Sequence, residues 1–92
     1  MIASFVHKGL KELFENGNTA KIDRKMHERI KRRLDAIDRA RSARDLNVPG
    51  FDFHGLKGFD PMRYSVHVNG PWCITFEFEG EDARRVDLEQ YH

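Results

Sequence analysis

One apolar stripe constrains the first half of this chain more than any other feature. Between residues 22 and 37 the large apolar side chains fall three or four residues apart, at Ile22, Met26, Ile30, Leu34 and Ile37. This is the spacing of one face of an α-helix. Asp23 stands where a carboxylate can accept from free backbone amides at a helix start. The pattern predicts a helix over about residues 23–43 whose apolar face lies in the core.

A shorter helix is predicted before the long one. Leu10, Leu13 and Phe14 have the i, i+3, i+4 spacing of a helix face. Asn16-Gly17 predicts its end, because glycine takes the left-handed conformation without a Cβ clash. Residues 2–6 are a short apolar stretch that predicts a first strand.

After Pro49-Gly50 the period of the apolar residues changes from the helical one to two, the alternation typical of strands. Alternating or β-branched stretches lie at 51–54, 64–68, 72–78 and 84–90, separated by turn-forming residues such as Asn69-Gly70-Pro71. Helices followed by meandering strands predict an α+β fold, with two amino-terminal helices packed on one face of a twisted antiparallel sheet.

The length of 92 residues predicts one domain, residues 1–92. A domain this small has little interior to enclose a deep pocket, so its chemistry is expected in a surface groove or on a macromolecule. No apolar run approaches the roughly 18 residues that span a bilayer, and the start Met1–Phe5 does not resemble a signal peptide. Cys73 is the single cysteine, so no intrachain disulfide forms, and a reducing cytoplasm is expected.

Charge is divided unevenly along the chain. Residues 1–44 carry 12 Lys/Arg and 6 Asp/Glu, a net charge of +6. Residues 45–92 carry 4 Lys/Arg and 9 Asp/Glu, a net charge of −5. The basic half is either a surface for a polyanion or a solvated helix face. If it is such a surface, its cations are expected to contact nucleic-acid phosphates or the acidic residues of a protein partner, and they are Lys25, Arg29, Arg32, Arg33, Arg39, Arg41 and Arg44.

The chain has five histidines, but no pair has the spacing of a zinc-protease helix, so neither a metal nor another cofactor is predicted. Cys73 lies inside a predicted strand and is expected to pack rather than react. His54 and Lys57 suit attack of a ribose 2′-hydroxyl on the adjacent phosphate, because that reaction needs a proton acceptor, a proton donor and a cation. On composition alone, a histidine such as His54 is more often a structural strand residue than a catalytic one.

Several motifs together resemble the HigB-type toxins of the RelE/ParE superfamily, also called plasmid-maintenance killer proteins. They are H-x-L-K-G at 54–58, Tyr64-Ser65-Val66, W-x-I-T-F at 72–76 and the final Tyr91-His92. The resemblance runs from end to end and is strongest over residues 51–92. It implies a RelE-like fold and cleavage of mRNA in the ribosomal decoding site, by 2′-hydroxyl attack that leaves a cyclic phosphate.

The resemblance also implies roles for individual residues. His54 matches a family histidine that acts as acid or base, and Lys57 matches a lysine near the scissile phosphate. Tyr91 matches a tyrosine that orients the substrate or carries a proton, and His92 matches the histidine after it.

This chain departs from the family pattern at two positions. Cys73 stands where the family has an arginine expected to clamp the phosphate, and a neutral thiol does not replace that charge. Gln90 replaces the acid before the tyrosine and keeps only its hydrogen-bonding capacity. Arg63 or His67, in the neighbouring strand, is the hypothesised replacement cation.

The resemblance further implies a cognate antitoxin, expected to be a small helix-turn-helix DNA-binding protein that forms a hetero-oligomer with the toxin, and the ribosome with its mRNA as target. Two alternatives stay open because of the missing arginine. One is a gyrase inhibitor of the same fold, like the ParE branch, and the other is a degenerate toxin that only binds its antitoxin.

Overall fold

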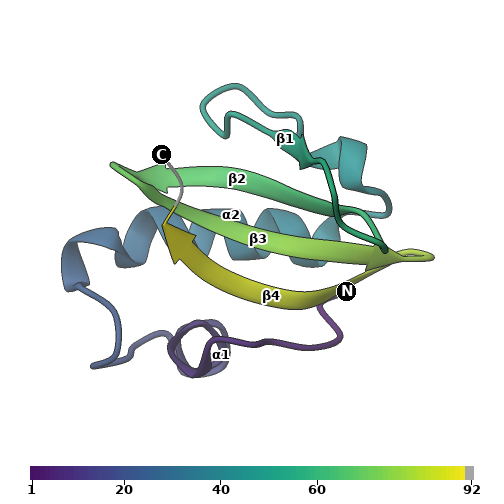
Figure 1. Cartoon of the computed structure of the whole chain (residues 1–92). Helices are drawn as coiled ribbons and strands as arrows, with labels where there is room; N and C mark the ends of the chain where they lie inside the picture. The colour runs from purple at the N-terminus through teal and green to yellow at the C-terminus, as the bar shows by residue number, and fades with distance from the viewer. Residues whose placement is uncertain (91–92) are drawn as a thin grey trace.

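The computed structural model describes residues 1–90 and confirms the expected α+β architecture (Figure 1). Its helical part precedes all of its sheet. Along the chain the elements are α1 (Lys8–Asn16), the 3-10 turn η1 (Arg24–Met26), α2 (His27–Arg39), the 3-10 turn η2 (Ala43–Leu46), β1 (His54–Leu56), β2 (Arg63–Asn69), β3 (Trp72–Glu79) and β4 (Asp82–Gln90). No helix among them has the length and hydropathy needed to cross a bilayer.

The starts and stops of the helices are set by local chemistry. As predicted, α1 ends at Gly17, which has a φ of 81° and donates its amide to the carbonyl of Leu13. The Asp23 carboxylate accepts from the amide of Lys25 at 3.1 Å, as expected of a cap. It caps the 3-10 turn η1, which leads directly into α2.

The predicted end of the long helix at residue 43 is wrong by four residues. Helix α2 ends at Arg39, and Ala40 turns into extended backbone with a ψ of 141°. The Asp45 carboxylate then accepts from the amides of Arg41 and Ser42, at 2.9 and 3.3 Å. Because those amides are satisfied by a side chain, they are not available for another helical turn.

The four strands pair in the order β1-β2-β3-β4, all antiparallel. The strand predicted at 51–54 is misplaced, because β1 starts at His54 and pairs with residues 63–65 of β2. Asp52 has a φ of 48°, which breaks the extended run before the pairing begins. His54 therefore opens the strand instead of ending it, and Lys57 lies in the loop that follows.

Residues 2–6, predicted as a first strand, make only two isolated bridges with β4, both parallel: Ile2 with Ala83 and Phe5 with Val86. Between these bridges β4 bulges at Arg85, which has a φ of 52° and donates its amide to the Ser4 hydroxyl at 2.9 Å. The bulge interrupts the ladder, so this segment lies along β4 without forming a continuous strand.

The helices cover one face of the sheet. Figure 1 shows α2 running behind the strands and α1 lying beyond β4. Ile30, Leu34 and Ile37 of α2 are fully buried, as predicted from the stripe. They pack in one core with alternate residues of the strands, Val66, Val68, Ile74, Phe76, Val86 and Leu88.

Candidate functional site

The opposite side of the sheet, which we call the open face, gathers the polar residues of the strands. Because directly paired residues share a face and neighbours alternate, the strand register defines its members. They include His54, Arg63, Ser65, His67, Cys73, Thr75, Glu77, Asp87 and Glu89. The open face thus brings together His54, Arg63 and His67 from the sequence prediction with position 73, where the family arginine is missing.

Arg63 is the most firmly held cation on the open face. Its Nη2 donates to the Thr75 hydroxyl at 2.7 Å and to the Glu89 carboxylate at 3.2 Å. The Thr75 hydroxyl in turn donates to the same Glu89 oxygen. Thr75 is fully buried and the Arg63 side chain is only 14% exposed, so the network is sheltered from water.

The hydrogen bonds of the Arg63 guanidinium to Thr75 and Glu89 use only its Nη2. Its Nε is buried without a hydrogen-bond partner among residues 1–90. The guanidinium carbon also lies 5.5 Å from the ring centre of Phe59, which places the loop after β1 against it. A buried donor without an acceptor is costly, so Nε is an unsatisfied atom within this network.

His67 lies directly across the β2–β3 hairpin from Cys73, as predicted. Its Nε2 is 2.9 Å from the carbonyl oxygen of Gly70, in the turn of the same hairpin.

Burial, and to a smaller degree the nearby Asp52 carboxylate, raises the pKa of the Cys73 thiol. The thiol is therefore neutral at physiological pH and supplies no charge to a phosphate.

His54 lies at the edge of the open face with an acidic partner. Its Nε2 is 3.1 Å from an Asp52 carboxylate oxygen, and both side chains are largely exposed. Lys57 is exposed in the loop that follows β1. Tyr91 and His92 lie outside the described residues, and Gln90, the last residue of β4, pairs with Trp72.

The predicted basic cluster on α2 contains two kinds of arginine. Arg33 is 9% exposed, and its guanidinium donates to the carbonyls of His67, Arg29 and Gly50 at 2.6, 3.1 and 3.2 Å. It also lies 4.6 Å from the ring centre of Phe51. This geometry gives Arg33 a structural role, tying α2 to β2 and to the loop before β1. Arg29 and Arg32, by contrast, are exposed.

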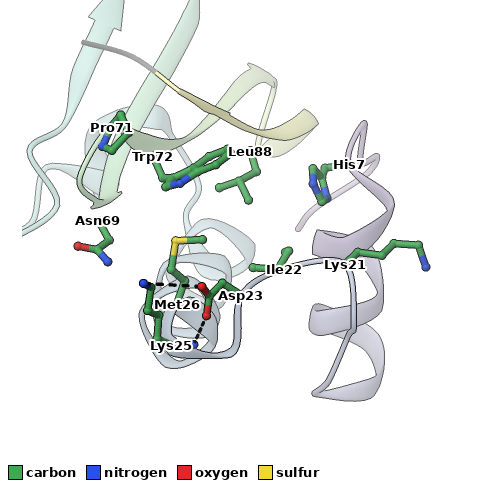
Figure 2. A pocket seen from close by; sticks show the side chains of 10 residues that line it. All are labelled: His7, Lys21, Ile22, Asp23, Lys25, Met26, Asn69, Pro71, Trp72 and Leu88. Atoms are coloured by element: carbon green, nitrogen blue, oxygen red, sulfur yellow. Dashed lines mark hydrogen bonds and ion pairs between the residues drawn. The ribbon is translucent and has the colours of Figure 1, made fainter.

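A separate cavity of about 420 Å³ lies where the start of α2 meets the β2–β3 turn and the end of β4 (Figure 2). Trp72, Met26 and Leu88 give it an apolar wall. The lysines that line it are already paired, Lys25 with Asp23 at 3.7 Å and Lys21 with Glu12 at 2.5 Å. Both lysines of this cavity thus have an acidic partner within the described residues.

Sequence reasoning missed Asp52, Thr75 and Glu89. The alternation Asp52-x-His54 was a weak signal for the first, since residues two apart in extended chain point to the same side. Nothing in the sequence marked Glu89 as the partner of Arg63, because 26 residues separate them. Their contact depends on the register of three strands.

Two comparisons with known proteins agree with this geometry. Residues 3–92 match the family model described as the RelE-like toxin of the type II toxin-antitoxin system HigB. The chain is also 44% identical to a protein of Proteus vulgaris named Endoribonuclease HigB, and the match covers all of both chains. A match over nearly every residue, on a fold of this architecture, shows that the chain belongs to the HigB-like family of RelE-like toxins of type II toxin-antitoxin systems.

Proposed function

We propose that the chain is an endoribonuclease toxin that cleaves mRNA on the ribosome, without a metal ion, and is held inactive by its antitoxin. The full-length similarity to a protein named Endoribonuclease HigB supports the nuclease activity over gyrase inhibition. The observation that carries the mechanism is the open face, where a histidine with an acidic partner and a sheltered arginine share one sheet surface.

In this mechanism the 2′-oxygen of one ribose attacks the adjacent phosphorus while the bond from phosphorus to the 5′-oxygen breaks. The products are a 2′,3′-cyclic phosphate and a 5′-hydroxyl. One protein group takes the proton of the 2′-hydroxyl, and another protonates the leaving 5′-oxygen. We assign the first or second of these roles to His54, and Asp52 orients its ring.

We assign the second proton carrier to Tyr91 or His92, on the family resemblance alone. Lys57 is close to His54 in the chain and lies in an exposed loop, so it adds positive charge beside the scissile phosphate. Gln90, next to both terminal side chains in sequence, offers an amide for the substrate. No step of this reaction requires a redox cofactor.

Arg63 is the better of the two candidates for the missing phosphate cation. It is charged at every physiological pH, and Glu89 and Thr75 fix its orientation. Its Nη1 makes no hydrogen bond within residues 1–90, so this nitrogen is available to a phosphate oxygen. The Nε2 of His67 is instead already engaged with the carbonyl of Gly70.

A type II toxin has an antitoxin partner, and family membership establishes that much. We propose that this antitoxin is a small helix-turn-helix protein that forms a hetero-oligomer with the toxin. Activity on translating ribosomes would place the toxin in the cytoplasm.

The test is cleavage of a defined message on purified 70S ribosomes, with naked RNA as the control. We expect cuts only when ribosomes are present, with a cyclic phosphate on the upstream fragment. Supercoiling inhibition by the protein in a gyrase assay, with intact message on ribosomes, would replace this proposal with the gyrase alternative.

A further inference from the structure

A second positively charged feature lies at the edge of the sheet, beyond the short strand β1. Here α2, the loop at 49–51 and β2 enclose a cleft of about 370 Å³. Its lining is mostly polar or cationic and consists of Arg29, Arg32, Arg33, Pro49, Gly50, Phe51, His67 and Val68.

The positive charge of this cleft is not compensated within the described chain. No Asp or Glu oxygen lies within 4.0 Å of a guanidinium nitrogen of Arg29, Arg32 or Arg33 in residues 1–90, although other surface cations have such partners. Burial, followed by the charges of Arg29 and Arg32, lowers the pKa of Arg33. Three like charges therefore lie close together, and an anion from outside would stabilise them.

The three arginines of the cleft differ in how many of their donors are already bound to the protein. Each guanidinium nitrogen of Arg33 donates to a backbone carbonyl, so this side chain is held in place at the base of the cleft. Arg29 uses one nitrogen to hold the carbonyl of Val68 at 3.2 Å, and Arg32 makes no hydrogen bond within residues 1–90. The donors that face a ligand are therefore those of Arg32 and the remaining ones of Arg29.

The cleft is continuous with the open face through His67, which lines the cleft and lies opposite Cys73. We infer that the cleft binds a phosphate of the RNA backbone, at a subsite separate from the scissile phosphate. Guanidinium groups match phosphate oxygens in a forked geometry, and a chain of phosphates can occupy both places at once. That the anion is an RNA phosphate rests on the proposed function, whereas the binding of an anion in the cleft does not depend on it.

Direct binding tests the subsite without any cleavage. The probe is a 2′-O-methyl RNA hexanucleotide, which has no 2′-hydroxyl to attack, titrated into labelled protein and followed by NMR. We expect amide shifts at Gly50, Phe51 and Val68. Arg32→Gln and Arg29→Gln together should weaken binding about tenfold and lower the slope of log Kd against log salt by about 0.7 for each lost phosphate contact.

The matched control is Arg24→Gln, which removes the same charge from an exposed position one turn before α2 and outside the cleft. If Arg24→Gln weakens binding as much as Arg32→Gln, or if the shifts cluster away from the cleft, the inference is wrong. Binding of an acidic peptide but not of the oligonucleotide would also overturn it and assign the cleft to a protein partner.

Two sources of the phosphate are separated on the ribosome. If the message supplies it, the loss of cleavage in Arg32→Gln disappears when the message is shortened to end close to the cut. If ribosomal RNA supplies it, the same loss persists on the short message. An Arg32→Gln protein that cleaves both messages like the unmodified toxin contradicts the inference, whereas an unmodified protein that never cleaves contradicts only the proposed function.

Discussion

On the face of the sheet that the helices cover, β2, β3 and β4 contribute large apolar side chains to the core. On the open face, alternate residues of the same strands contribute a buried hydrogen-bond network centred on Arg63, Thr75 and Glu89. The first face stabilises by removing apolar area from water, which depends little on detailed geometry. The second depends on each donor meeting its acceptor, so it suits the placing of charge for chemistry.

The comparison predicts that the largest loss of activity will come from a residue that contributes almost nothing to stability. His54→Ala should reduce ribosome-dependent cleavage about 10²- to 10⁴-fold, because it removes a proton carrier. The side chain is 63% exposed, so the free energy of unfolding should change by less than about 0.5 kcal/mol. Single-turnover cleavage and urea unfolding measure the two effects.

Asp52→Asn is the companion variant, since it keeps the shape of the partner of His54 but removes its charge. A smaller loss of cleavage than that of His54→Ala is expected if Asp52 orients the ring. Equal cleavage rates for His54→Ala and the unmodified protein would remove His54 from the mechanism.

On the covered face the opposite pattern is expected. Ile30→Ala should lower the free energy of unfolding by about 2–5 kcal/mol, because the fully buried side chain leaves a cavity. Val48→Ala is the control, since that side chain is exposed and should cost less than about 0.5 kcal/mol. Cleavage per folded molecule should be unchanged at low temperature. A loss of rate without a loss of stability would mean that the two faces are not separable.

Arg63 both stabilises the fold and is proposed to hold the phosphate, so its replacement should change both the free energy of unfolding and the cleavage rate. Arg63→Ala leaves the Thr75 hydroxyl without its donor and Glu89 with the Thr75 hydroxyl as its remaining partner, and should cost about 1–3 kcal/mol in stability. It should also slow cleavage at least tenfold if Arg63 holds the phosphate. Arg84→Ala, which breaks the exposed pair with Glu79, should cost no more than about 1 kcal/mol and leave cleavage intact.

A lysine at position 63 sharpens this test. Arg63→Lys keeps the charge but loses the fork that meets two acceptors at once. We expect it to recover most of the stability and little of the rate. Full recovery of both would show that only the charge at this position matters, and unaltered cleavage in Arg63→Ala would return the search for the cation to His67.

The smallest expected effect concerns Cys73. Since burial and the Asp52 carboxylate raise the pKa of the thiol, the reactive thiolate is scarcer than in a free cysteine at pH 8. Alkylation by iodoacetamide should therefore be slower than for a small thiol, and should speed up as the pH rises past the ordinary cysteine pKa. Asp52→Asn should quicken it slightly. A rate equal to that of glutathione at pH 7 would show an unshifted thiol.

The sequence by itself determined the covered face. The stripe from Ile22 to Ile37, the glycine after α1 and the alternation in the last three strands each reflect a local period or cap, and each appears in the structure. The errors fall where backbone amides had a competing acceptor or the chain left regular geometry. Asp45 ends α2 early, Asp52 delays β1, and the bulge at Arg85 keeps residues 2–6 from forming a strand.

Only the tertiary structure decided how the open face is arranged. His54, Arg63 and His67 could be named from the sequence, but the pairing of Arg63 with Glu89 and the distinction between Arg33 and Arg32 could not. Periodicity reports which side of a helix or strand a residue occupies. It does not report which distant carbonyl or carboxylate that residue will meet, because those contacts are set by the register of paired strands and by the position of α2 across them.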